Sequence, residues 1–404
     1  MKILMISATF PYPPTRGGTP IRTFNLLKYL SQRHPVTLVV QRSEDVSDEE
    51  VEQLRQYVDE LVIFPRPHND QRKTGTWPKI QRLGQFVVEG TPPSVRSIYS
   101  ESMQEWIDKW VNTGKCEAIT CEHSVNEIFV RPEWKQQLKT VVDVHSSVYG
   151  TIRQQLETHT AEKPLRDRLN LPLLYRYEKR YCSKFSVIVA TTEEDRHQLQ
   201  AFNPKATFET VPNGVDLSQF PPRTQDPGGH RLIFVGTMDY IANIDAARYF
   251  SLEVFPKLKH RYPDATLALV GARPVPEVSE LSKIPGIEVT GRVPSMAEYL
   301  HQATVCIVPM RIGFGIKNKT LEAMAAGVPV VASNSGLEGL AVDGANVPLR
   351  ALRANTVEEY IAAISRLFED AQLRQQLSDQ ARTLIETEYT WERAGQRYEQ
   401  VLLG

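Results

Sequence analysis

Residues 308–333 read VPMRIGFGIKNKTLEAMAAGVPVVAS, and this stretch decides the fold of the second half of the chain. It predicts a strand, a glycine loop, a helix, a turn and a further strand. The loop leaves backbone N–H groups free just before the helix starts, and the helix dipole also favours negative charge there. Lys317 and Lys319 bring two cations to this place, and Glu322 shares a helix face with Lys319. We therefore expect a nucleotide site, with lysine on the diphosphate and Glu322 on the ribose hydroxyls.

An ordinary strand–helix–strand unit is the simpler interpretation of the same letters. It explains Gly327 and Pro329, which end the helix and lead into the next strand. It does not explain two lysines and a glutamate around a glycine loop, so the nucleotide site is the favoured hypothesis.

Residues 321–332, LEAMAAGVPVVA, resemble the corresponding motif of the family-4 retaining glycosyltransferases. The chain is most similar to a subgroup with GTMDY, here residues 236–240, and GIKNK, here residues 315–319. The resemblance implies an α/β fold of two doubly wound, parallel-sheet, Rossmann-like domains that face a cleft (the GT-B architecture), with a C-terminal helix crossing back to the first domain. It also implies a hexosyltransferase that uses a nucleotide-diphosphate sugar and retains the anomeric configuration.

The pattern along the chain predicts two domains. At 404 residues the chain is long for one core, and short apolar runs alternate with helical patterns in both halves. Proline and glycine cluster between the halves, as in a linker. The expected boundaries are an acceptor-binding domain over 1–204, a linker over 205–230, a nucleotide-sugar-binding domain over 231–388 and the returning helix over 389–404.

Composition narrows the function classes. The hydrophobic fraction of 41% and the net charge of −1 are those of a globular protein with no general attraction to nucleic acid. No apolar run approaches the roughly 20 residues that span a bilayer, and the N-terminus lacks the apolar core of a secretion signal. The four cysteines have no metal-ligand spacing. We expect a cytoplasmic protein.

The loop after the first strand contains Gly17 and Gly18, which let backbone amides approach a charged ligand. The loop is not a GxGxxG sequence, so a nicotinamide-type site is poorly supported. From spacing alone a plain turn explains the pair equally well. The resemblance implies that these glycines face the donor diphosphate and the acceptor.

Two histidines follow predicted strands. His145 ends the run VVDVH, and the resemblance places it near the transferring sugar, so we expect a catalytic, substrate-contacting residue. His123 ends another strand, where a structural role and a role in lining the acceptor site remain open. Asn213, in TVPNGVD, is expected at the hinge and near the cleft.

The predicted donor site departs from the family pattern in its cations. Thr237 and Asn243 stand where many members carry an arginine and a lysine. The positive charge is therefore expected from Arg311, Lys317 and Lys319, with Lys319 as the main phosphate contact and a catalytic group. The full predicted donor-binding set comprises Gly17, Gly18, Thr237, Asp239, Gly271, Arg292, Val293, Arg311, Phe314, Gly315, Ile316, Lys317, Lys319 and Glu322.

A second departure concerns the donor sugar. Phe314 lies eight residues before Glu322, where the family carries the first of two glutamates. Backbone amides from Gly315 to Lys317 are expected to do part of its work. No Asp-x-Asp motif is present, so we expect no metal and no cofactor beyond the nucleotide-diphosphate sugar as co-substrate.

The acceptor is expected to be a glycan or a lipid-linked molecule. Residues 66–96 and 153–184 are locally basic, and the first of these segments interleaves its charges with apolar residues. They form either a membrane-surface patch at the inner face of a membrane or a solvated helix face over the core. Neither segment suggests nucleic-acid binding.

Two other functions remain open from the sequence. One is a nucleotide-sugar epimerase or phosphorylase on the same fold. The other is a catalytically weak, nucleotide-binding scaffold subunit of a polysaccharide assembly, which the two departures would suit.

Overall fold

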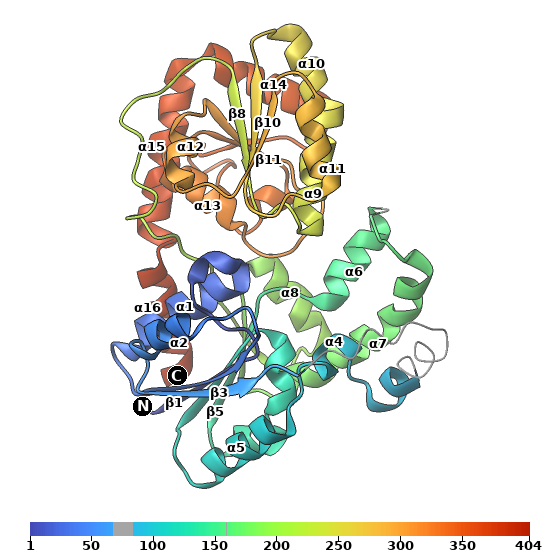
Figure 1. Ribbon diagram of the computed structural model, residues 1–404, viewed down its shortest axis with the longest axis vertical. Helices are drawn as coiled ribbons and strands as arrows, with labels where there is room; N and C mark the ends of the chain where they lie inside the picture. The colour runs from blue at the N-terminus through green and yellow to red at the C-terminus, as the bar shows by residue number, and fades with distance from the viewer. Residues whose placement is uncertain (68–83, 159) are drawn as a thin grey trace. The chain divides into compact units, whose positions relative to one another are not determined.

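The computed structural model describes residues 1–67, 84–158 and 160–404 (Figure 1). The chain divides into two compact units. Unit 1 comprises Met1–Pro212 with Ala394–Gly404, and unit 2 comprises Asn213–Arg393. Each unit is built on its own parallel sheet, which confirms the predicted α/β class of two doubly wound domains.

The sheet of unit 1 has seven strands in the order β3-β2-β1-β4-β5-β6-β7, and its pairings are parallel. Its central strands are apolar and buried because helices cover both faces of a doubly wound sheet. The strands are β1 (Ile3–Ser7), β2 (Val36–Arg42), β3 (Glu60–Pro65), β4 (Ala118–Glu122), β5 (Lys139–Val144), β6 (Val187–Ala190) and β7 (Thr207–Thr210).

The α-helices of unit 1 connect these strands in the manner of successive crossovers. The last helix, α16, comes from the C-terminal end of the chain. They are α1 (Gly18–Ser31), α2 (Asp48–Arg55), α4 (Pro93–Arg96), α5 (Glu101–Asn112), α6 (Val148–Glu157), α7 (Pro164–Cys182), α8 (Glu193–Phe202) and α16 (Trp391–Leu403).

The sheet of unit 2 has six strands in the order β10-β9-β8-β11-β12-β13, again parallel. Its strands are β8 (Arg231–Val235), β9 (Thr266–Val270), β10 (Ile287–Gly291), β11 (Val305–Val308), β12 (Val330–Ala332) and β13 (Leu352–Arg353). Its helices are α9 (Ile241–Tyr249), α10 (Phe255–Arg261), α11 (Pro276–Ser279), α12 (Met296–His301), α13 (Asn318–Ala325), α14 (Val357–Glu369) and α15 (Ala371–Glu388).

The strand order reverses beside the first strand of each unit, between β1 and β4 in unit 1 and between β8 and β11 in unit 2. Connections on the two sides of such a point leave toward opposite faces of the sheet, so the loops at the carboxyl ends part and leave room for a ligand. The glycine loops of the sequence lie at these points, since one follows β1 and the other follows β11.

The linker is shorter than expected. Thr207–Thr210 forms β7 and pairs with β6, although it lies within the stretch predicted as linker over 205–230. Its four residues carry one buried side chain, Phe208, so the alternation is too short to stand out among the neighbouring prolines and glycines. The boundary between the units falls after Pro212.

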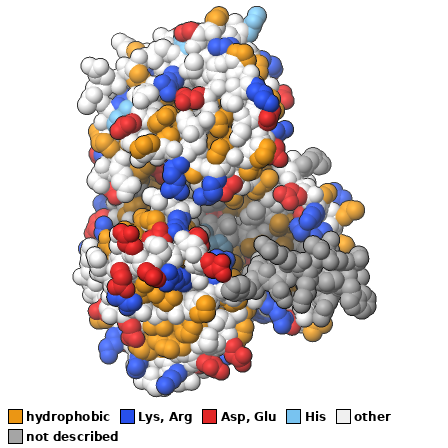
Figure 2. Space-filling view, in the orientation of Figure 1, with side chains coloured by type: hydrophobic (Ala, Val, Ile, Leu, Met, Phe, Trp, Pro, Cys, Tyr) orange, Lys and Arg blue, Asp and Glu red, His pale blue; other side chains and the backbone are white. Residues whose placement is uncertain are grey.

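Two further features concern the helices and the surface charge. Among the described helices, none is long and apolar enough to cross a membrane. Basic and acidic side chains are interspersed over the face of each unit seen in Figure 2. That view therefore shows no broad field of one sign of the kind that attracts polyanions.

From Ala394 onward, helix α16 belongs to unit 1. A Cβ atom added to Gly395 would lie 2.1 Å from Cγ of Tyr29 on α1, so the helix approaches α1 at a distance that only glycine allows. Glu399 of α16 contacts α1 and the residues that follow it. Its carboxylate accepts a hydrogen bond from the hydroxyl of Tyr29 on α1 at 3.2 Å and lies 2.7 Å from Nε2 of His34, just after α1. Tyr398 is fully buried.

We expect Gly395→Val to lower the free energy of unfolding of unit 1 by about 1–3 kcal/mol, because the new side chain would overlap the buried ring of Tyr29. Urea unfolding followed by circular dichroism measures this change. Gln400→Ala, on the exposed face of the same helix, is the matched control and should leave the midpoint unchanged. An unchanged midpoint for Gly395→Val would contradict the close packing of α16 on α1.

Candidate functional site

In unit 2 the candidate site is built where the ends of β8 and β9 come unusually close. A Cβ on Gly271 would lie 1.7 Å from the carbonyl oxygen of Gly236, so backbone occupies the space that a side chain would need. A Cβ on Gly236 would lie 2.7 Å from Nδ2 of Asn243 and 2.9 Å from Nζ of Lys319. Glycine at both positions therefore lets a lysine ammonium reach the carboxyl ends of the strands.

Lys319 lies in the first turn of α13, and its ammonium reaches the carboxyl ends of β8 and β9 beside Gly236. Its Nζ donates to Oδ1 of Asn243 at 2.5 Å and lies 4.4 Å from the ring centroid of Phe234. Nδ2 of Asn243 donates to the carbonyl of Thr237 at 2.8 Å, so the amide is fixed with its oxygen toward the lysine. Burial lowers the pKa of Lys319 to about 7, although Cys306 and Glu322 oppose the shift.

Glu322 lies one turn further along α13. Burial raises the pKa of its carboxyl to about 7, while the charge of Lys319 acts in the opposite direction. Both groups therefore have a pKa near neutral pH, where a charged ligand nearby would change the protonation of each.

The other two predicted cations have protein partners. Lys317 is buried, and its Nζ donates to the carbonyl of Gly315 at 2.5 Å and to Glu338 at 3.1 Å, so it braces the glycine loop from inside. Arg311 is exposed, forms an ion pair with Asp245 on α9 and lies over the ring of Tyr249. A ligand phosphate would compete with these carboxylates at both positions, whereas Lys319 has a neutral amide as its partner.

The glycine loop is held by groups that the sequence did not single out. Gly315 has a φ of 76°, a left-handed conformation that suits glycine. The Ser335 hydroxyl donates to the carbonyl of Gly313 at 3.0 Å, and the Ser333 hydroxyl donates to the carbonyl of Met310 at 2.5 Å. The sequence did contain a signal for this support, namely the two serines in the turn directly after the apolar strand β12.

The remaining residues of the predicted set lie around the same strand ends. Asp239, in the loop after β8, forms an ion pair with Arg273, which follows β9. Arg292 and Val293 directly follow β10. Ile316 is buried in the core of unit 2, and Phe314 is half-buried.

Asn213 is the first residue of unit 2, and its Nδ2 donates at 2.8 Å to Oδ1 of Asn318, where α13 begins.

In unit 1 a second group of predicted residues gathers at the carboxyl ends of β1, β4 and β5. Gly17 has a φ of 151° and precedes α1, and a Cβ on Gly17 or Gly18 would meet no atom within 4 Å. This loop is therefore open to a ligand. His145, directly after β5, lies with Nδ1 3.3 Å from the Thr19 hydroxyl, so the histidine borders the same loop.

His123 packs edge-to-face against His145, with ring centroids 5.1 Å apart. Burial lowers the pKa of His123 to about 3, so the ring is neutral, and its Nδ1 accepts a hydrogen bond from the amide of Val125. Its φ of 81° is unusual for a residue other than glycine. This intraprotein hydrogen bond supports the structural alternative for His123.

A buried ion pair lies behind His145. Arg22 of α1 donates through Nε to Oδ2 of Asp143 at 2.6 Å and through Nη2 to Oδ1 at 2.9 Å. Nε2 of His145 lies 3.2 Å from Oδ2 of Asp143. Burial alone would raise the pKa of the Asp143 carboxyl, but the Arg22 guanidinium and the His145 ring hold it below its usual range.

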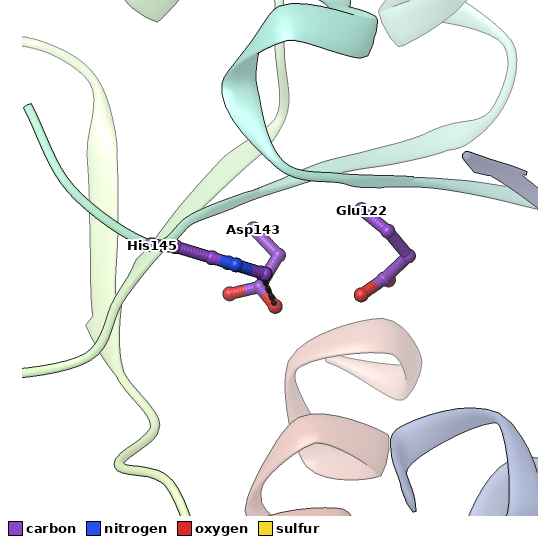
Figure 3. Close-up of side chains that lie close together, drawn as sticks. All are labelled: Glu122, Asp143 and His145. Atoms are coloured by element: carbon purple, nitrogen blue, oxygen red, sulfur yellow. Dashed lines mark hydrogen bonds and ion pairs between the residues drawn. The ribbon is translucent and has the colours of Figure 1, made fainter. Parts of the chain in front are cut away.

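Glu122, at the end of β4, completes this cluster (Figure 3). It accepts hydrogen bonds from the hydroxyls of Thr120 at 3.0 Å and Tyr398 at 3.4 Å. Burial and the nearby charge of Asp143 raise the pKa of Glu122 to about 8. The carboxyl is therefore protonated at neutral pH, which avoids a second buried negative charge beside Asp143.

Among the described residues, Glu122, Asp143 and His145 form the group whose ligand atoms approach closely enough for a metal ion, within 4.8 Å of one another. Both oxygens of Asp143 already accept N–H groups from Arg22. A divalent ion there would lie beside a buried guanidinium, so this set of donors does not fit a metal.

Comparisons with known proteins agree with this architecture. A model described as "Glycosyltransferase Family 4" matches residues 16–219, and one described as "Glycosyl transferases group 1" matches residues 229–370. Anabaena HepE, solved in complex with UDP and glucose, is similar over 100% of both chains with a TM-score of 0.66 at 13% identity. TarM is similar over 100% of this chain and 99% of its own, with a TM-score of 0.68 at 11% identity.

Curated relatives match part of the chain. Glycogen synthase of Mycobacterium tuberculosis is 24% identical over 54% of each chain. A "GDP-mannose-dependent monoacylated alpha-(1-6)-phosphatidylinositol monomannoside mannosyltransferase" of Corynebacterium glutamicum is 28% identical over 50% of this chain and 58% of its own. This chain thus spans about half the length of the curated relatives it matches.

The family-4 model covers half of the 404 residues, and the fold and the strand-end positions of the glycine loops agree with it; the chain belongs to glycosyltransferase family 4.

Proposed function

We propose that this glycosyltransferase moves a hexose from a nucleotide-diphosphate sugar to a glycan or glycolipid acceptor with retention of configuration, in the synthesis of surface polysaccharide or glycolipid. The observation that carries the donor class is the ammonium of Lys319. It lies in the first turn of α13 at the switch point of unit 2, with a neutral amide as its partner. The solved complexes of HepE with UDP and UDP-glucose support a nucleotide sugar as the donor.

The proposed chemistry uses fixed charge to stabilise the leaving group. As the bond from the sugar to the diphosphate breaks, negative charge develops on the diphosphate oxygens, and a preorganised cation lowers the energy of that state. Lys319 supplies the cation, and the free amides before α13 supply hydrogen-bond donors. Glu322 accepts from the ribose hydroxyls.

Phe314 sets a limit on how the sugar is held. The phenyl ring of Phe314 cannot accept the hydrogen bonds from sugar hydroxyls that a carboxylate would accept at this position. The backbone of residues 315–317 supplies polar groups in its place. Retention rests on family membership and not on a residue of this site.

Charge and nucleotide contacts can be separated by substitution. We expect Lys319→Ala to weaken nucleoside diphosphate binding about 10–100-fold, because a charge-assisted contact contributes about 1.5–3 kcal/mol, and to affect the nucleoside little. We expect Glu322→Ala to weaken both ligands alike, because both contain the ribose. Isothermal titration calorimetry measures the affinities.

A screen of bases and sugars by thermal shift precedes these titrations and identifies the nucleotide to use. Lys283→Ala, an exposed lysine of unit 2, is the control for loss of surface charge. Equal losses of diphosphate and nucleoside in Lys319→Ala would remove the phosphate role. Binding without turnover would favour the scaffold alternative, and conversion of the donor without any acceptor would favour the epimerase or phosphorylase.

The low pKa of Lys319 predicts that donor binding takes up a proton. Free Lys319 has a pKa of about 7, and an adjacent diphosphate favours the charged amine and raises that pKa. Affinity for the nucleoside diphosphate should therefore be highest below pH 7 and fall by up to about tenfold per unit as the pH rises above it. Glu322→Gln serves as the background, because the other titrating group of the site is then absent.

Calorimetry between pH 7.5 and 9 in buffers of different ionisation enthalpy reads the proton uptake directly. This range lies above the second ionisation of a phosphate, near pH 6. Adding Lys319→Met to the background should abolish the uptake. If the affinity still falls with rising pH after this substitution, the proton uptake belongs to a group other than Lys319.

For the acceptor we propose a lipid-linked molecule reached at the inner face of a membrane, through α7 and the neighbouring residues 84–89. Leu165 and Leu169 of α7 are 76% and 70% exposed, and Val88 is 86% exposed. Arg180 of α7 donates to the carbonyl of Glu89 at 2.8 Å, which joins the two segments. Residues 68–83, which carry part of the predicted basic segment over 66–96, lie outside the described residues.

We expect Leu165→Asp with Leu169→Asp to reduce binding to vesicles of anionic phospholipid at least about tenfold, because two exposed leucines lose their insertion energy of about 1.5–3 kcal/mol each. Vesicle sedimentation measures the bound fraction. Leu403→Asp, which alters an exposed leucine at the far end of α16, is the control. Equal binding by all three proteins would favour the solvated-face alternative.

A further inference from the structure

The ring nitrogens of His145 are both engaged by side chains of unit 1. Nε2 faces Oδ2 of Asp143 at 3.2 Å, and Nδ1 faces the Thr19 hydroxyl at 3.3 Å. The ring is largely buried, with 12% of its side chain exposed. Its orientation is therefore set by partners within unit 1.

The chemistry of these partners decides which nitrogen carries the proton. Both oxygens of Asp143 accept from Arg22, so the carboxylate is held in the charged, acceptor-only form. Nε2 of His145 must then donate to it as Nε2–H. In a neutral imidazole Nδ1 is consequently an acceptor, and the Thr19 hydroxyl donates to it.

The first turn of α1 supplies both the residue that contacts Nδ1 of His145, Thr19, and the residue that holds Asp143, Arg22. Thr19 and Arg22 are three residues apart at the start of the helix, directly after Gly17 and Gly18, and three residues bring side chains to one helix face. The glycine loop is thus connected to His145 through two hydrogen-bonded routes.

We propose that Asp143, held by Arg22, is the positioning residue for His145, and that it fixes the ring with Nε2 toward the carboxylate and Nδ1 toward the Thr19 hydroxyl beside the glycine loop. Asp143 does not touch the substrate and acts only through His145. This inference rests on the proposed function, which supplies the substrate.

The tautomer of His145 can be read in the wild-type protein without any activity. Full-length protein labelled with 15N-histidine is recorded by long-range 1H–15N correlation, and His145→Gln identifies the signal. At a pH high enough to leave the ring with one proton, we expect that proton on Nε2. A singly protonated ring that carries its proton on Nδ1 would overturn the proposal.

A kinetic comparison tests whether Asp143 acts through His145. We expect Asp143→Asn to lower kcat at least about tenfold with nucleoside diphosphate affinity within twofold of wild type, since misplacing a substrate-orienting group affects the reaction more than donor binding. Arg22→Lys, which keeps the charge and loses the two-pronged contact, should lie between Asp143→Asn and wild type.

Glu127→Gln is the matched control, because it removes another buried carboxylate of unit 1 that is paired with a cation, here Lys184. It should lose comparable stability in urea and keep kcat within twofold. Equal loss of kcat in this control would reduce Asp143 to a structural role. If Asp143→Asn does not fold, the tautomer of His145 in the wild-type protein still tests whether Asp143 orients the ring. Absence of nucleotide binding would refute the proposed function and leave the tautomer result standing by itself.

Discussion

The reversal of strand order in each sheet is the constraint on which both candidate sites depend. Where neighbouring parallel strands send their helices to opposite faces, the loops part at the carboxyl ends, and backbone groups there are left for a ligand or for a buried side chain. In unit 2 this opening receives Lys319, and the glycines at 236 and 271 make the room. In unit 1 it receives His145 and the glycine loop before α1.

The two units treat a buried cation in opposite ways, and the difference lies in the partner. Removing a charge from water costs several kcal/mol, which only a close opposite charge with further hydrogen bonds can offset. Arg22 has such a partner in Asp143 and stays charged as part of the frame. Lys319 has neutral partners, the amide of Asn243 and the thioether sulfur of Met310, and burial lowers its pKa to about 7. In the proposed function a diphosphate restores its charge. The first pair is suited to holding a shape and the second to responding to a ligand.

Sequence predicted the fold class, and the strand ends at which the candidate residues lie, more fully than the direction of their side chains. The run LEAMAAGVPVVA sets strand, helix and turn through local pattern, and β11, α13 and β12 lie where that pattern puts them. Lys317 was expected to face a phosphate, yet its ammonium turns to Glu338, a partner 21 residues away that local spacing cannot indicate. Asp143 was read only as part of a buried strand, because its partner Arg22 is 121 residues distant.

The proposed chemistry divides between the units according to what each can supply. Unit 2 holds a titrating cation, and the developing charge of a leaving diphosphate is the kind of change to which such a group responds most strongly. Unit 1 holds a ring whose Nε2 faces the carboxylate of Asp143, so Nδ1 is the nitrogen that remains to orient a group beside the glycine loop. The direction of this ring is set by an ion pair within unit 1 and needs no change of charge. In the proposed chemistry, orientation of the substrate and stabilisation of the leaving group are therefore assigned to different units.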